Sequence, residues 1–187
     1  GSSGLLIFAI FMLPLLLTPQ MITQAERSFA EFGYPREATE FSLPAYFLGI
    51  PAQQCRIYKD QLYYQDANIE LYYDAFLPPP AKMVPGGNPA IIRIHGGGWL
   101  VGNKGKGNRL QLSKYLAAEG YVVFDIQYGL SDLRDISIAA PPPDYLRGNH
   151  NIDDMVAHIG FFTQHLATTA SRYGVNLGAV FFSGGSA

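Results

Sequence analysis

The amino-acid sequence predicts an α/β fold in which helices cover both faces of a mostly parallel sheet. Residues 90–94 and 121–126 are short, almost wholly apolar runs, which is typical of strands buried on both faces. Residues 108–119, between them, have the spacing of a helix, and a strand–helix–strand order implies a right-handed parallel crossover. A second helix at 151–173 and a third apolar run at 177–182 continue the alternation.

The composition fits one domain of ordinary size. The chain has 187 residues, of which 48% are hydrophobic and 15% charged, so it can build a core. Its net charge of −2 argues against nucleic acid as a partner, because such a partner requires a basic face. The single cysteine, Cys55, allows neither an internal disulfide nor a multi-cysteine metal site, and we interpret it as a small, buried or half-buried hydrophobic residue.

Residues 1–25 form an apolar N-terminal segment. The stretch from Leu5 to Leu17 has no polar side chain, and its length suits the apolar region of a signal peptide better than a helix that crosses a bilayer, which needs about 20 residues. If the native chain extends further at this end, the stretch could instead be the end of a transmembrane helix. The other alternative is a buried core helix, which Pro14 disfavours. We therefore expect a membrane-associated or exported protein, with a cytoplasmic one as the alternative.

Residues 26–57 are predicted to be a connector or a cap segment. Residues 24–32 could form a short amphipathic helix, and three prolines interrupt any longer element: Pro35, Pro44 and Pro51. The repeated strand pattern of the main domain occupies residues 58–187.

The main domain is expected to open with two antiparallel strands. Residues 62–65 and 69–76 have strand character and are joined by a turn at 66–68. The connection at 127–149 is long and contains a run of prolines, so it either borders a functional site or is a solvated excursion.

The first helix of the main domain is expected at 108–119. Leu112, Tyr115 and Leu116 share one of its faces, which is predicted to be the buried one, and Gly120 follows where a left-handed C-cap belongs.

The helix at 151–173 has clear local signals at both ends. Asn151 can cap its N-terminus, Asp153 and Asp154 favour the positive end of its dipole, and Gly174 ends it.

Ser186 is the candidate nucleophile. It lies in Gly184-Gly185-Ser186-Ala187, directly after an apolar run, and Gly-x-Ser after a strand begins a nucleophile elbow. Alone, the pattern is more typical of an ordinary Gly/Ser loop. The full G-x-S-x-G pattern needs one further glycine after Ala187, so we expect the chain to be a fragment.

A second motif, His95-Gly96-Gly97-Gly98-Trp99, directly follows the strand at 90–94. Bare glycines let backbone N–H groups converge on one point, and in ester hydrolysis such donors stabilise the oxyanion by about 3–4 kcal/mol each. The alternatives are a flexible loop or a phosphate-binding turn, and the lack of any phosphate-loop spacing disfavours phosphate. The two motifs in this order, each following a strand, are more specific than either one.

Together these residues resemble the α/β-hydrolase superfamily, of the hormone-sensitive-lipase-like and bacterial esterase type. The resemblance covers about residues 58–187 and implies the N-terminal portion of that fold. The other matching residues are Gly102-x-Lys104, residues 120–124, Tyr128-x-Leu130, Asp153 or Asp154, Tyr173-Gly174-Val175 and Ser183. One departure is Gly129, where the family usually has arginine; we expect it to affect local packing more than chemistry.

The resemblance implies a serine hydrolase that cleaves carboxylic esters through an acyl-serine at Ser186. The oxyanion hole would use the backbone N–H groups of Gly97, Gly98 and Ala187, and His95 and Gly96 would support the loop. In this fold the acid and the histidine of the triad follow the nucleophile, so both are expected after Ala187 and the 187-residue chain alone is expected to be inactive. No metal or organic cofactor is implied, and the partner would be a small-molecule ester.

The other polar candidates are interpreted as structural. His158 and His165 lie seven residues apart on a predicted helix, whereas a metal would need a closer pair and a further ligand. His150 is an isolated loop residue that could approach the site, although nothing in its spacing indicates this. Asp153 and Asp154 lie upstream of the nucleophile in a first helical turn, so we do not interpret either as the triad acid.

Two alternatives to an esterase remain open. One is an amide-cleaving peptidase or formamidase with the same fold and machinery. The other is a non-catalytic, hydrolase-like binding module, which a missing histidine downstream would favour.

Overall fold

The computed structural model describes residues 2–30, 54–105, 108–131 and 143–186. The chain divides into two units, Gly1–Leu43 and Pro44–Ala187, which are described separately.

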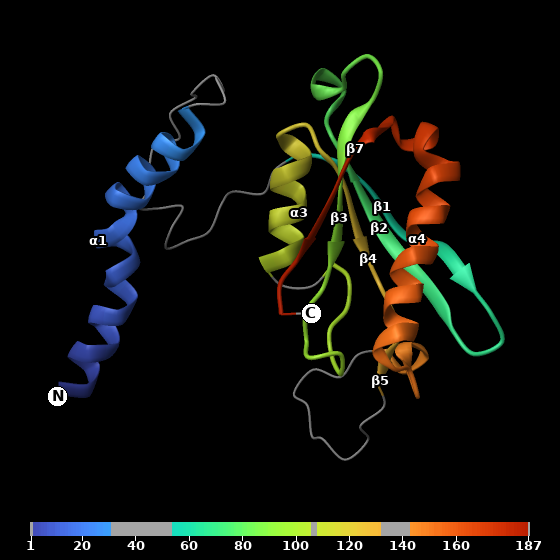
Figure 1. Cartoon of the computed structure of the whole chain (residues 1–187), viewed down its shortest axis with the longest axis horizontal. Coiled ribbons are helices and arrows are strands. Elements are labelled where there is room, and N and C mark those ends of the chain that lie inside the picture. The colour runs from blue at the N-terminus through green and yellow to red at the C-terminus, as the bar shows by residue number, and fades with distance from the viewer. Residues whose placement is uncertain (1, 31–53, 106–107, 132–142, 187) are drawn as a thin grey trace. The chain divides into compact units, whose positions relative to one another are not determined.

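The first unit contains one long helix, α1 (Ser2–Ala30) (Figure 1). The apolar segment and the start of the predicted short helix at 24–32 therefore belong to a single continuous helix, which corrects the prediction of a separate element. Pro14 and Pro19 lie inside this helix. Over the described ranges, no helix combines the length and the apolarity needed to cross a membrane. The membrane-associated or exported location and the boundaries at 25 and 57 stay predictions.

The second unit is built on a five-stranded sheet with the strand order β1-β2-β4-β3-β7. The strands are β1 (Arg56–Gln65), β2 (Glu70–Leu77), β3 (Asn88–Ile94), β4 (Val122–Ile126) and β7 (Val175–Gly184). β1, β2 and β4 pair antiparallel, whereas β3 pairs parallel with both β4 and β7. The predicted antiparallel opening, the parallel crossover and the α/β class are confirmed.

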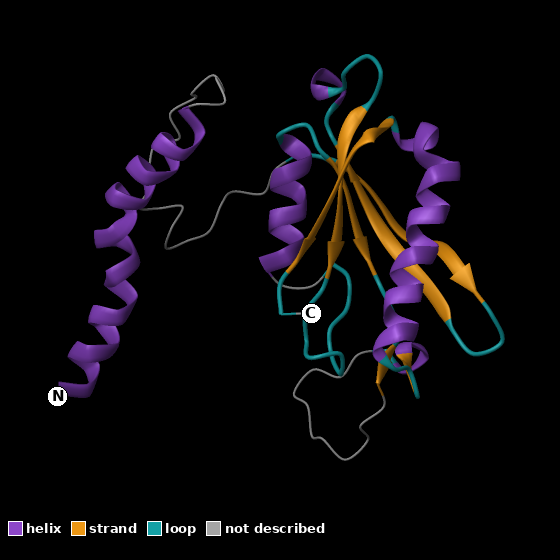
Figure 2. Cartoon of the chain, viewed as in Figure 1, coloured by secondary structure: helices purple, strands orange, loops and turns teal. Residues whose placement is uncertain are grey.

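Two helices cover opposite faces of this sheet, as Figure 2 shows. α3 (Asn108–Ala118) packs beside Phe76 and Val123, whereas α4 (Ile152–Tyr173) packs on the larger core around Ile92 and Phe124. Because neighbouring residues of a strand point to opposite faces, Val123 packs in the smaller core and Phe124 in the larger one. Cys55 is half-buried against the smaller core, as predicted.

The antiparallel hairpin turns at Asp66. Its Oδ1 accepts hydrogen bonds from the N–H groups of Asn68 (2.7 Å) and Ile69 (3.0 Å), which is the local bond that favours aspartate in turns. β1 begins at Arg56, earlier than the predicted start at 62. Its pairing with β2 shifts register between Tyr58 and Gln61, where a bulge interrupts the strand.

α4 has the predicted ends. The Asn151 side chain accepts a hydrogen bond from the Asp154 N–H at 3.0 Å, and the Asp154 carboxylate accepts one from the Asn151 N–H at 2.9 Å, which makes a reciprocal capping box. Gly174 ends the helix with φ 66°. The buried face of the helix consists of Met155, His158, Phe162, Leu166, Ala170 and Tyr173.

The buried face of α3 differs in part from the prediction: Leu116 packs against the smaller core, whereas Leu112 does not. Leu112 is 45% exposed, whereas Ser113 and Ala117 are completely buried. The reason is a charged side chain under the helix: the Arg93 guanidinium donates to Ser113 Oγ at 2.7 Å and to the Arg109 carbonyl at 2.6 Å. A small polar residue therefore faces the sheet, and the apolar leucine turns outward.

The connections contain short elements. The 3-10 helix η1 (Pro80–Lys82) follows β2. In the long connection, β5 (Leu130–Ser131) pairs parallel with β6 (Arg147–Gly148), and η2 (Asp144–Leu146) precedes β6. Most of the predicted proline run, residues 139–142, lies outside the described residues.

Candidate active site

The two motifs meet at one end of the sheet because their strands are neighbours. β3 ends at Ile94, immediately before His95, and β7 ends at Gly184, two residues before Ser186. Ile94 and Gly184 are partners in the parallel register. The carboxyl ends of parallel strands meet at one edge of a sheet, where ligand sites of open α/β folds form.

Ser186 has an unusual backbone conformation. Its φ is 59°, in the left-handed region that non-glycine residues rarely adopt, and its side chain is exposed. Such strain is typical of functional turns, including the strand-to-helix turn that presents a nucleophilic serine. Ala187 lies outside the described residues, so the structure gives no position for its predicted N–H donor.

The loop at residues 95–105, which we call the glycine loop, packs directly against the turn that carries Ser186. A Cβ atom at position 96 would lie 2.1 Å from the Gly185 carbonyl oxygen, a distance that permits only glycine. The Gly97 N–H donates to the Ser186 carbonyl oxygen at 3.2 Å. The loop after β3 and the turn after β7 therefore form one packed unit.

Gly97 is also required by the loop's own fold. Its φ is 138°, and a Cβ there would lie 2.0 Å from the Val101 carbonyl oxygen. The N–H groups of Leu100 and Val101 both donate to the Gly97 carbonyl at 3.2 Å, which closes a tight turn. Trp99 stands in this turn with its side chain 43% exposed, and its carbonyl accepts from the Ser131 N–H at 2.9 Å.

His95 is a buried support under the loop. Only 1% of it is exposed, and its ring stacks on Tyr128 with centroids 4.4 Å apart. The Tyr128 hydroxyl donates to the His95 carbonyl at 2.6 Å, and the His95 Nδ1 lies 3.2 Å from the Gly96 carbonyl, to which it can donate. Burial lowers the pKa of His95 to about 4, so the ring is neutral at pH 7.

The remaining histidines have packing contacts, which for His158 and His165 agree with their interpretation as surface or packing residues. His158 Nδ1 accepts a hydrogen bond from the Gly129 N–H at 3.1 Å, and His150 lies edge-on against the His158 ring at 5.2 Å. His165 Nε2 lies 3.2 Å from the Tyr73 hydroxyl. Within the described residues no histidine is hydrogen-bonded to Ser186, and no group of three or more His, Cys, Asp or Glu side chains could hold a metal ion.

Sequence reasoning missed two supports of the loop. Tyr128 was noted only as part of a pattern, but its ring and hydroxyl both hold His95. Lys104, also noted only in a pattern, is buried and bonded to Asp74 on β2 at 2.6 Å. The sequence offers no clear signal for the second support, because another lysine, Lys106, lies two residues further on.

The BD-FAE family model matches residues 74–187, which is more than half of the chain. The chain belongs to the BD-FAE family. This is an esterase-like family of α/β-hydrolases, so the predicted resemblance to that superfamily is confirmed.

Solved structures share the fold. Esterase B from Lactobacillus rhamnosis, in a structure with a C4-C4 SN3 tributyrin phosphonate, is 22% identical with a TM-score of 0.52, over 91% of this chain and 44% of that one. Esterase 2 from the Planctomycetes species Thermogutta terrifontis is 20% identical with a TM-score of 0.51, over 72% of this chain and 40% of that one. The chain thus spans less than half the length of these solved neighbours. No curated protein matches it.

Proposed function

We propose that this BD-FAE family member is a serine hydrolase that cleaves carboxylic esters through an acyl-serine intermediate at Ser186. One observation carries the proposal: Ser186 has a left-handed φ of 59° on the turn after β7, and this turn packs against the glycine loop that leaves the adjacent strand. A serine hydroxyl on such a turn and a set of backbone donors beside it are two of the parts that acyl transfer requires, and a general base is the third.

The proposed reaction has two steps. Ser186 Oγ attacks the acyl carbon, its proton passes to a general base, and the bond to the alcohol oxygen breaks as that oxygen takes the proton. Water then attacks the acyl-serine in the same way, which releases the acid and restores the hydroxyl. The base and its acid partner are the histidine and carboxylate that we expect after Ala187.

The proposed oxyanion hole uses the N–H groups of Gly97, Gly98 and Ala187. The Gly97 N–H is bonded to the Ser186 carbonyl in this structure, so an oxyanion could take this donor only in exchange for that bond. Each donor would contribute about 3–4 kcal/mol to the barrier reduction. We propose that His95 holds the loop and transfers no proton, because its ring is buried and neutral.

The solved neighbours indicate a suitable probe. Esterase 2 from Thermogutta terrifontis has been seen phosphorylated by paraoxon, in a structure with a TM-score of 0.51 to this one. Organophosphorus reagents of this kind would attach covalently to an activated serine, and the adduct can be weighed.

The test combines labelling with turnover. Paraoxon labelling, followed by mass spectrometry, and hydrolysis of p-nitrophenyl butyrate are measured for the 187-residue chain and for any longer product of the same gene. Ser186→Ala should abolish labelling and lower kcat by about 10⁴-fold or more, because the nucleophile is lost. Ser171→Ala, an exposed serine on α4, is the matched control and should change neither.

Two outcomes separate the proposals. Labelling and turnover that survive Ser186→Ala would overturn the assignment of the nucleophile. Robust Ser186-dependent turnover by the 187-residue chain alone would overturn only the expectation that this chain is inactive by itself.

A further inference from the structure

A row of charged residues crosses the sheet just below the candidate site. Asp74 on β2 and Asp125 on β4 are direct register partners, and Asp125 is in turn the partner of Arg93 on β3. All three are buried, with 4%, 1% and 7% of their surfaces exposed. Charged residues are rarely buried in strands without a specific partner, so this row requires an explanation.

The row contains two carboxylates side by side. Like charges that face each other on neighbouring strands destabilise a sheet, and more so when water is excluded. Burial raises the pKa of the Asp125 carboxyl, although the Gly105 hydrogen bond and Arg93 oppose this. The two carboxylates therefore need positive charge and hydrogen-bond donors nearby.

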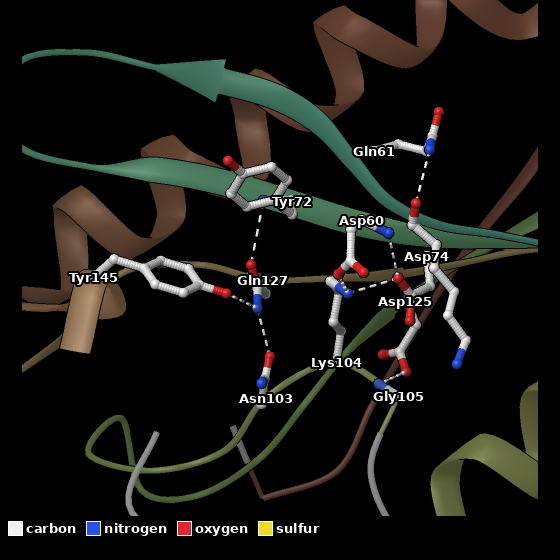
Figure 3. Close-up of polar contacts among 11 residues, drawn as sticks. Asp60, Gln61, Tyr72, Asp74, Asn103, Lys104, Gly105, Asp125, Gln127 and Tyr145 are labelled. Carbon is white, nitrogen blue, oxygen red and sulfur yellow. Dashed lines mark hydrogen bonds and ion pairs between the residues drawn. The ribbon is translucent and has the colours of Figure 1, made fainter. Parts of the chain in front are cut away.

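Lys104 supplies the positive charge. Its ammonium group donates to Asp74 Oδ1 at 2.6 Å and also bonds Asp60, as Figure 3 shows. The side chains of Lys104 and Asp74 are only 7% and 5% exposed. Burial alone would lower the pKa of Lys104, but the hydrogen bonds to Asp60 and Asp74 outweigh it and the pKa is raised.

The next residue binds the other carboxylate. The Gly105 N–H donates to Asp125 Oδ2 at 2.7 Å. A Cβ at position 105 would lie 2.9 Å from Asp74 Oδ2, and its φ is 65°, so a larger residue would disturb both contacts. Two consecutive loop residues are thus bonded to two neighbouring strands.

The bulge in β1 completes the arrangement. Asp60 has φ 53° at the register shift, and its N–H donates to the same Asp74 Oδ1 at 2.9 Å. Its carboxylate forms an ion pair with Lys104 from the solvent side, because the Asp60 side chain is 71% exposed. The strained residue in β1 therefore has a local reason: it brings a donor and a charge to the Asp74–Lys104 pair.

These contacts fix the far end of the glycine loop. The near end follows β3 and is held by the Tyr128 hydroxyl on the His95 carbonyl. The far end has the Lys104–Asp74 ion pair and the Gly105–Asp125 hydrogen bond. Between the two anchors lie Gly97 and Gly98, which have no side chains of their own to fix the backbone. Gly97 is held only by backbone contacts, to the Ser186 carbonyl and within its own turn.

We infer that Lys104 is a positioning residue, whose buried ion pair with Asp74 anchors the glycine loop and so aims the Gly97 and Gly98 N–H groups at the bound ester. This inference rests on the proposed function for its catalytic consequence, but the anchoring itself is a property of the fold. Lys104 contacts no reacting atom and acts through the loop backbone.

The test uses a pair of variants that avoids a lone buried charge. Lys104→Met alone leaves Asp74 unpaired and could unfold the protein, so Lys104→Met is combined with Asp74→Asn, which keeps the shape of the aspartate. Lys104→Arg is the conservative variant. Lys82→Met, which replaces an exposed lysine of η1, is the matched control.

The first readout is independent of activity. Amide hydrogen exchange of the segment 95–105 should increase at least tenfold in Lys104→Met/Asp74→Asn and stay unchanged in Lys82→Met and Ser186→Ala. Exchange that is unchanged in the double variant would overturn the inference, whether or not the protein is an esterase.

The second readout is kinetic. In protein that hydrolyses p-nitrophenyl butyrate, the double variant should lower kcat by about 100-fold and change KM by less than about threefold, because misplaced donors act on the transition state. Lys104→Arg should recover most of this loss. An unchanged kcat with a raised KM would overturn the positioning role. If exchange increases as expected but a longer product of the same gene, carrying the expected histidine and acid, hydrolyses no ester, the anchor stands and only the proposed function fails.

Discussion

At the scale of single residues, Gly129 explains a departure from the family pattern. The space that a side chain would occupy there is filled by two histidine rings: a Cβ at position 129 would lie 2.7 Å from His150 Cδ2 and 2.8 Å from His158 Cε1. The Gly129 N–H also bonds His158. A side chain at position 129 and these two rings cannot occupy the same place, which gives the glycine a structural reason.

Gly129→Ala should therefore destabilise the protein by about 1–3 kcal/mol, because overpacking forces rigid rings to move. Urea unfolding of the variant and the unmodified protein measures this free energy. Combining Gly129→Ala with His150→Ala should recover part of the loss. If the double variant lost as much free energy of unfolding as the two single variants together, the steric explanation would be contradicted.

The candidate site was only partly predictable at this scale. The positions of Ser186 and the glycine loop follow from local motifs, because small residues are needed wherever backbones meet closely. The Lys104 anchor was not predictable, because its partners Asp60 and Asp74 are distant in sequence and a bulge in β1 brings one of them into place. Local patterns carry no information on such a bulge.

At the scale of elements, α4 and α3 show why one helix was predicted well and the other less so. The ends of α4 depend on residues within the helix or beside it, namely Asn151, Asp154 and Gly174, so the sequence displays them. The buried face of α3 depends on Arg93, which comes from a different element. Periodicity places apolar residues inward and cannot foresee a buried guanidinium.

Asn151→Ala should lower the free energy of unfolding by about 1 kcal/mol, because it removes one half of the capping box at the start of α4. Chemical denaturation measures the change. Asp153→Ala is the comparison: this exposed neighbour takes no part in the box, so its loss should be smaller and should shrink further in high salt. Equal losses in the two variants would argue against the cap.

At the scale of the whole molecule, buried histidines make stability depend on pH. Burial lowers the pKa of His95, His158 and His165. In the unfolded chain these rings bind protons near pH 6.5, whereas in the folded chain they resist protonation. For these three rings the unfolded state therefore binds more protons below this pH, so their contribution to stability falls as the pH falls. The raised pKa of Asp125 acts in the opposite sense.

We expect the free energy of unfolding to be constant above about pH 7.5 and to fall steadily between about pH 6.5 and 4. His95 alone, with its pKa of about 4, should contribute a loss of about 3 kcal/mol over this window. Urea unfolding at pH 7.5, 6 and 5 measures the slope, and His95→Gln should flatten it. A slope that the substitution leaves unchanged would contradict the buried, neutral ring.

The α/β class, the parallel crossover and the antiparallel opening were all predictable, because alternating apolar runs and helical spacing are regular features. The full length of β1 was not, since its first half alternates weakly and contains the bulge at Asp60. The strand register decides which residues face which of the two cores. This register was not predictable, because it depends on pairing between segments that are distant in the sequence.

The pairing of β3 with β7 has a consequence for the order in which the molecule forms. Ile94 meets Gly184 across a parallel ladder, about 90 residues later in the chain. Parallel pairs of such long separation cannot close until the crossover between them has docked, because the entropy of a large loop opposes early contact. During synthesis, α3, β4 and α4 can pack before β7 is complete. The turn that carries Ser186 and its contact with the glycine loop are therefore acquired only after α3, β4 and α4 have packed.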